Sequence, residues 1–94
     1  MANYTTNEKS LLTFLEEHRE QTQNLITSEN HTMWYWKSAS YIDDVKAGNM
    51  VHPTNGQVDF YITNCENRLK PLRFRLNWLE SQIKKFNKNL EVSI

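Results

Sequence analysis

One stretch of the sequence decides the fold: residues 57–90 read QVDFYITNCENRLKPLRFRLNWLESQIKKFNKNL. Apolar residues recur in it at alternating steps of four and three, a spacing that places them along one face of a helix. This row, called the seam below, consists of Val58, Ile62, Cys65, Leu69, Leu72, Leu76, Leu79, Ile83, Phe86 and Leu90. The unbroken pattern predicts one long amphipathic helix that packs against other helices.

Pro71 falls inside this pattern without shifting it. Proline removes one backbone hydrogen bond, and its ring clashes with the carbonyl of Asn67, so it predicts a kink. Because the heptad phase continues across it, we expect one kinked helix over residues 57–90. That helix would be about 51 Å long, whereas a compact globule of this chain length is about 32 Å across. The protein is therefore expected to be elongated or to share its core with another chain.

A first helix is predicted over residues 6–27. Thr5 and Glu8 form a capping-box pattern, in which each side chain satisfies a free backbone donor at the start of the helix. His18 and Thr22 interrupt the apolar face in its middle. The core-facing side chains of this helix are expected to be Leu11, Leu12, Leu15, Leu25 and Ile26.

A second helix is predicted over residues 33–47. Residues 28–32 (SENHT) lack apolar side chains and favour a turn before it. Lys46 followed by Gly48 suits its end, because glycine readily adopts the left-handed conformation that closes a helix.

Residues 48–56 contain both glycines of the chain and predict a loop. A competing interpretation is a β-hairpin around Asn55–Gly56, with residues 58–63 paired to residues 50–52. The long heptad pattern favours the helical alternative. We therefore expect an all-α protein, a small bundle of three helices forming one domain over residues 1–94.

The composition is that of a small globular protein. The 94 residues are 38% hydrophobic, the mean hydropathy is −0.74, and no long apolar run or secretory signal is visible. One cysteine excludes an internal disulfide and is compatible with a reducing compartment. These features predict a soluble, cytoplasmic protein, and the abundance of Asn and Lys is typical of a phage or a low-GC bacterium.

The charge is divided between the two halves of the chain. Residues 1–47 carry four Lys or Arg against seven Asp or Glu, and residues 48–94 carry seven against four. Mutual attraction of the two halves in the folded chain is the simplest explanation, and a nucleic-acid surface is the alternative.

Catalysis is not indicated by any motif. His18, His31 and His52 have no metal-ligand spacing around them, and Cys65 occupies a seam position that favours a buried thiol. Two glycines are too few for a phosphate-binding loop. We therefore expect no enzyme activity, no cofactor and no metal, and a packing role for His18.

Large apolar residues outside the seam point to an interaction surface. With Ile62 at heptad position a, Pro71 and Trp78 fall at c and Phe74 at f, so the three form an outer stripe. Either the helix at 33–47 covers this stripe or a partner does. The run at residues 33–36 (MWYW) has four consecutive large side chains, which point in different directions around a helix and cannot all enter one core. The candidate partner-binding residues are Trp34, Trp36, Phe74 and Trp78.

Taken as a whole, the sequence predicts a small helical interaction protein. Its expected role is that of a regulator or inhibitor that occludes a partner macromolecule, of the anti-defence or immunity type, and it is expected to form a homo-oligomer. One alternative is an oligomer that binds a nucleotide-like anion through Arg68, Arg73 and Arg75. Another is a small nucleic-acid-binding protein that uses the cations of the long helix.

Overall fold

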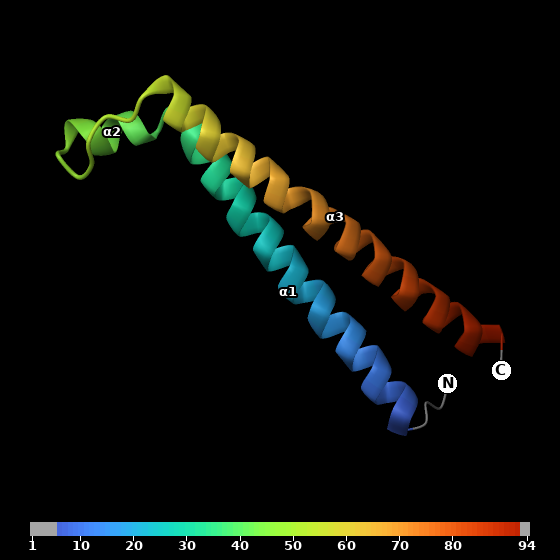
Figure 1. Ribbon diagram of the computed structural model, residues 1–94. Coiled ribbons are helices and arrows are strands. Elements are labelled where there is room, and N and C mark those ends of the chain that lie inside the picture. The colour runs from blue at the N-terminus through green and yellow to red at the C-terminus, as the bar shows by residue number, and fades with distance from the viewer. Residues whose placement is uncertain (1–5, 93–94) are drawn as a thin grey trace.

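The chain folds into a helical hairpin. The computed structural model describes residues 6–92, with side chains described from residue 8 to residue 88. Two long helices, α1 (Thr6–Lys37) and α3 (Asn55–Val92), run antiparallel side by side, and the short α2 (Tyr41–Lys46) lies at the tip (Figure 1). The described residues contain no strand. The all-α prediction with a long C-terminal helix is confirmed, whereas Thr5 of the predicted capping box lies outside the described residues.

The molecule is a thin rod. Its extents are 62 × 21 × 17 Å and its radius of gyration is 20.0 Å. A compact globule of this length would have a radius of gyration of about 12 Å. The expected elongation is therefore observed, and its cause is that α1 and α3 pack along their whole length while α2 stays at one end (Figure 1).

The seam of α3 faces α1 in the predicted register. Cys65, Leu69, Leu79 and Ile83 are buried, and the other seam residues from 58 to 86 are partly buried. The helix continues through Pro71 without interruption, as the unbroken heptad phase predicted. The side chain of Leu90 lies outside the described ones.

The opposing seam of α1 is more polar than expected. Its seam positions also alternate in steps of four and three and are all buried or half-buried: Glu8, Leu12, Leu15, Arg19, Thr22, Ile26, Glu29, Met33 and Trp36. Thr22 is fully buried, and its hydroxyl donates a hydrogen bond of 2.7 Å to the carbonyl of His18. Leu11 and Leu25, which were expected in the core, are instead half exposed beside the seam.

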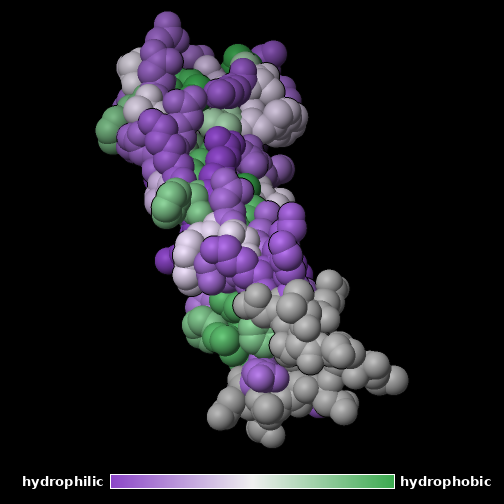
Figure 2. Space-filling view, turned by 90° about the vertical axis from the view of Figure 1, so that its right-hand side faces the viewer, coloured by the Kyte–Doolittle hydropathy of each residue, from purple (hydrophilic) through white to green (hydrophobic). Residues whose placement is uncertain are grey.

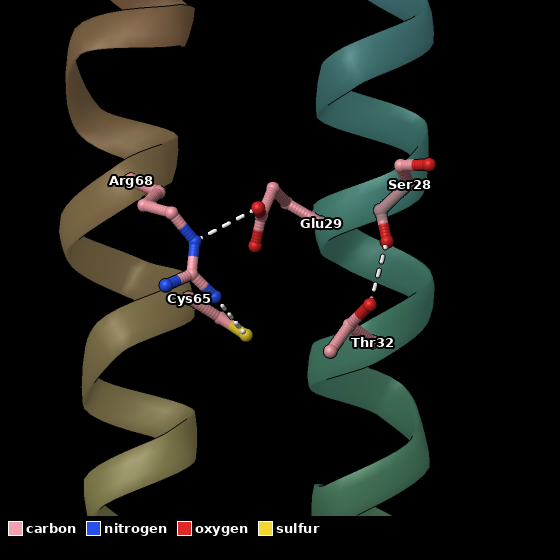
Figure 3. Close-up of polar contacts among 5 residues, drawn as sticks. All are labelled: Ser28, Glu29, Thr32, Cys65 and Arg68. Atoms are coloured by element: carbon pink, nitrogen blue, oxygen red, sulfur yellow. Dashed lines mark hydrogen bonds and ion pairs between the residues drawn. The ribbon is translucent and has the colours of Figure 1, made fainter.

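The predicted turn at residues 28–32 is wrong, because α1 runs straight through it. The hydroxyl of Thr32 donates a hydrogen bond of 3.1 Å to the carbonyl of Ser28, one helical turn earlier (Figure 3). Glu29 continues the seam between Ile26 and Met33 and contacts α3. Packing against α3 thus outweighs the weak helix propensity of this segment.

The first helix ends at residues 38–40 instead, so the predicted helix over 33–47 is divided. Ala39 adopts a left-handed conformation with φ of 60°. Residues 33–37 therefore belong to α1, and only residues 41–46 form α2. Gly48, with φ of 78°, follows the end of α2 as its sequence position predicted.

Left-handed residues at these two helix ends give a stability prediction. An L-residue with a Cβ pays roughly 1 kcal/mol in this conformation, and glycine does not. Ala39→Gly should therefore raise the free energy of unfolding by about 0.5 kcal/mol, and Gly48→Ala should lower it by about 1 kcal/mol. Urea unfolding followed by circular dichroism measures both, and a loss of stability in Ala39→Gly would contradict the left-handed assignment.

A capping box begins α3. The backbone N–H of Gln57 donates to the Thr54 hydroxyl at 3.1 Å, and the backbone N–H of Thr54 donates to the Gln57 side chain at 2.9 Å. These reciprocal bonds satisfy donors that would otherwise be free at the helix start. Asn55 and Gly56 consequently lie in the first turn of α3. The alternative β-hairpin around them is wrong.

Candidate interaction surface

The two flanks of the hairpin differ in chemistry. In an antiparallel helix pair, residues at heptad position g of both helices border one flank and those at e border the other. The g flank contains two shallow depressions, and we call it the apolar flank. One depression is lined by Leu25, Glu29, Arg68, Pro71, Leu72 and Arg75. The other is lined by Leu11, Leu15, Trp78, Gln82, Lys85 and Phe86.

The apolar flank exposes large hydrophobic side chains. Leu11 and Leu25 of α1 are about half exposed, and Trp78 of α3 is 52% exposed. Pro71 lies one heptad before Trp78 and is also exposed. Hydrophobic areas along the face of the rod shown in Figure 2 are separated by hydrophilic ones. Leu11, Leu25, Pro71 and Trp78 are all exposed at g or c positions, so they form an apolar row along this flank that no described part of the chain covers.

The opposite flank has a polar e row, and exposed Trp34 of α1 lies beside this row at position b. Lys37 and Glu66, both at position e, form an exposed ion pair across the two helices at 3.5 Å. The complete e row contains no apolar residue, and it consists of Lys9, Glu16, Gln23, Asn30, Lys37, Asp59, Glu66, Arg73, Glu80 and Asn87. We call this row the polar flank. It has the composition of an ordinary solvated surface.

A polar layer interrupts the apolar seam beside the first depression. The guanidinium of Arg68 donates a hydrogen bond of 2.8 Å from Nε to Glu29, and its Nη2 lies 3.4 Å from the sulfur of Cys65 (Figure 3). The carboxylate of Glu29 raises the pKa of Arg68. The second oxygen of Glu29 is buried and has no hydrogen-bond partner among the described residues. A charge pair in the seam fixes which residues of α1 and α3 face one another.

The three arginines proposed as an anion site do not converge. Arg68 and Arg75 line the same depression, but the charge of Arg68 is engaged by Glu29. Arg73 falls at position e and therefore belongs to the polar flank. Within one chain Arg73 thus lies on the other flank from Arg68 and Arg75, because residues two or five positions apart project to different sides of a helix. An anion site formed by arginines of adjacent subunits stays a prediction.

An aromatic cluster holds the tip together. The ring of Trp36 lies 4.6 Å from that of Tyr61 and 5.3 Å from that of buried Tyr41. The Tyr35 hydroxyl donates a hydrogen bond to the carboxylate of Asp44, which ties α1 to α2. Trp36 was expected on an exposed helix face. The structure instead half-buries it, because the chain reverses after Lys37.

The other predicted aromatic positions remain exposed. Trp34 is 56% exposed and stacks on His31 with ring centroids 6.0 Å apart. Phe74 is 76% exposed on the outer face of α3, next to the apolar flank. The suggestion that a second helix covers Pro71, Phe74 and Trp78 is wrong, since α2 lies at the tip of the rod (Figure 1).

Metal-binding and membrane-spanning sites are absent from residues 8–88. No three His, Cys, Asp or Glu side chains in this range lie together so that they could hold a metal ion. None of the helices has a stretch long and apolar enough to cross a membrane within the residues that are described. His18 is half-buried, and its ring lies 4.2 Å from that of Phe14.

Comparison with known proteins gives no relative. No family model, curated protein or solved structure matches this chain.

The buried thiol of Cys65 is expected to make the folded protein less stable at alkaline pH. Burial raises the pKa of its thiol, and the nearby negative charge of Glu29 adds to this effect. The folded state therefore holds the thiol proton more tightly than the unfolded state, whose cysteine titrates near about pH 8.5. This contribution to stability is complete below that pH and is lost as the pH rises through the raised pKa.

The test is urea unfolding between about pH 7 and pH 10. The wild-type midpoint should fall across this range more steeply than that of Cys65→Ala, which has no thiol to ionise. A thiol reagent should also modify native Cys65 slowly and unfolded Cys65 quickly, because the side chain is 1% exposed. Parallel pH profiles for the two proteins would contradict the burial of an uncharged thiol.

Proposed function

We propose that this protein is a small, non-enzymatic interaction protein that binds a partner protein along its apolar flank. Its role is that of a regulator or inhibitor that occludes a surface of the partner. The observation that supports this proposal is the placement of exposed Leu11, Leu25 and Trp78 beside two depressions, whereas the e row of the polar flank has no apolar residue. Exposed apolar patches bordered by polar residues are typical of interaction sites.

The shape of the molecule agrees with this role. A hairpin of two helices buries few side chains, and the buried hydrophobic ones in the described helices are Leu15, Tyr41, Cys65, Leu69, Leu79 and Ile83. Adding a helix to one side of such a pair buries more apolar surface, at about 25 cal/mol per Å². A partner that fills the apolar flank would therefore complete the core of a larger bundle and stabilise the rod.

The experiment compares two variants in affinity purification from the cells that make this protein. Trp78→Ala removes the largest exposed side chain of the apolar flank, and Glu80→Ala is a matched control two residues away on the polar flank. A partner retained by wild type and Glu80→Ala should be lost with Trp78→Ala. Calorimetry with the purified partner should then show about a thirtyfold weaker affinity for Trp78→Ala, as for a central aromatic anchor.

The proposal fails if the two variants retain the same proteins with the same affinities. Circular dichroism of both variants checks that the hairpin stays folded. Trp78 is half exposed, so its truncation should leave most of the helical signal unchanged.

A further inference from the structure

We infer that the partner of the apolar flank is an amphipathic α-helix whose apolar face is bordered by Asp or Glu side chains. This inference rests on the proposed function and names the chemistry of the partner. It follows from two features of the flank, which are the sign of its charge and the spacing of its two depressions.

The first feature is a surplus of positive charge. Arg75 lies at the first depression and Lys85 at the second, and neither forms an ion pair with a described acidic residue. No Asp or Glu occupies a g or c position of α1 or α3. The one acidic group that reaches this flank is Glu29, from the seam, and it is engaged by Arg68. A partner with acidic side chains at its edges would complement Arg75 and Lys85.

The second feature is the groove between the helices. Leu25 borders the first depression and Leu11 the second. They are fourteen residues apart on α1, which corresponds to about 21 Å along the helix axis. A third helix lying in this groove would place one apolar residue in each depression at about the same spacing, so it needs roughly four turns or more. Its apolar residues should follow the same steps of three and four.

Other occupants fit the flank less well. A second copy of the chain that used the same flank would bring Arg75 and Lys85 against a surface of like charge. Nucleic-acid affinity rises with the number of phosphates neutralised, and two free cations are few for such a surface. A flat lipid surface would not fill depressions that lie between two helices. Each of these occupants is nevertheless distinguished by the experiment.

The experiment uses the full chain and two synthetic helical peptides of about 18 residues, long enough for the groove. Both peptides carry the same heptad row of Leu and Ile, one bordered by Glu and the other by Lys. Fluorescence anisotropy should give at least about tenfold tighter binding of the Glu peptide at low salt, and this preference should shrink at high salt. Trp78→Ala should weaken the Glu peptide by about thirtyfold.

Charge reversal gives the decisive comparison. The double variant Arg75→Glu/Lys85→Glu should prefer the Lys peptide. The matched control Arg73→Glu/Lys84→Glu also replaces two positive charges by negative ones, but outside the apolar flank. Arg73 lies in the polar row, and Lys84 lines a depression on that side. That control should keep the preference for the Glu peptide.

Each other result has a defined meaning. Equal binding of both peptides, lost in Trp78→Ala, would overturn the acidic partner and leave the apolar flank as a docking surface. Binding of neither peptide would overturn the helical partner, whereas the purification experiment above tests the proposed function separately. Tighter binding of an oligothymidylate or of phosphatidylglycerol vesicles than of the Glu peptide would also overturn the acidic helical partner. A dimer that sedimentation detects and that Trp78→Ala dissociates would overturn this partner as well.

Discussion

Leu69→Ala is expected to lower the free energy of unfolding by about 2 to 5 kcal/mol, the range for buried leucines. Leu69 is 0% exposed and lies in the middle of the seam of α3. Truncating it leaves a cavity between two helices that have no second core layer to close it. Because small domains are stable by only about 5 to 15 kcal/mol, this one change should remove a large part of the stability.

Urea unfolding followed by the helical signal measures this effect. The control is Lys70→Ala, which changes the next residue on an exposed position of the same helix and should stay within about 0.5 kcal/mol of wild type. Similar small losses for both variants would show that the seam does not face α1.

Trp36→Ala is the second change with a large expected effect, a loss of about 2 to 4 kcal/mol, somewhat below the range for fully buried aromatics. The Trp36 ring packs between those of Tyr41 and Tyr61, so it joins α1, α2 and α3 at the tip. Trp34→Ala is the matched control. Trp34 is two residues away, exposed, and in ring contact with His31 of its own helix, so its loss should cost much less.

Near-ultraviolet circular dichroism and thermal unfolding of the two tryptophan variants test this difference. Trp36→Ala should lose aromatic signal and unfold at a lower temperature than Trp34→Ala. The reverse order would mean that Trp36 is a free surface residue.

The long helix was predictable because its seam is apolar at every position. The seam of α1 was harder to find, since Arg19, Thr22 and Glu29 occupy positions where apolar residues were sought. The predicted apolar face therefore contained the seam residues Leu12, Leu15 and Ile26 but also Leu11 and Leu25, which each lie one residue away from the seam. The spacing from Ile26 to Glu29 to Met33 continues the heptad pattern through residues 28–32. This continuity indicated a helix where a turn was predicted.

Two helix ends show the limits of local sequence signals. α1 ends at Lys37 and the chain turns at Ala39, a residue type that gives no warning of a left-handed conformation. Hydrogen bonds and ring contacts made by Tyr35 and Trp36 hold the chain there, and such tertiary contacts are not visible in the sequence. In contrast, the capping box of Thr54 and Gln57 was available in the sequence and would have excluded the β-hairpin.

The candidate surface was predictable in part. Heptad positions correctly placed Phe74 and Trp78 outside the seam, and the structure leaves both exposed. They did not show that Leu11 and Leu25 border the same flank as Trp78, because that requires the register between α1 and α3. The polar layer of Glu29 and Arg68 helps to set this register, and it joins residues 39 positions apart in the chain.

The central claim is that one flank of this hairpin, and not the other, contacts a partner. Site-specific photocross-linking in the cells that make the protein tests it most directly, with the photoreactive residue at Gln82 on the apolar flank or at Glu80 on the polar flank. We predict a discrete adduct from position 82 that disappears when Trp78→Ala is also present, and no adduct from position 80. Adducts of equal yield from both positions, or from neither, would contradict the claim.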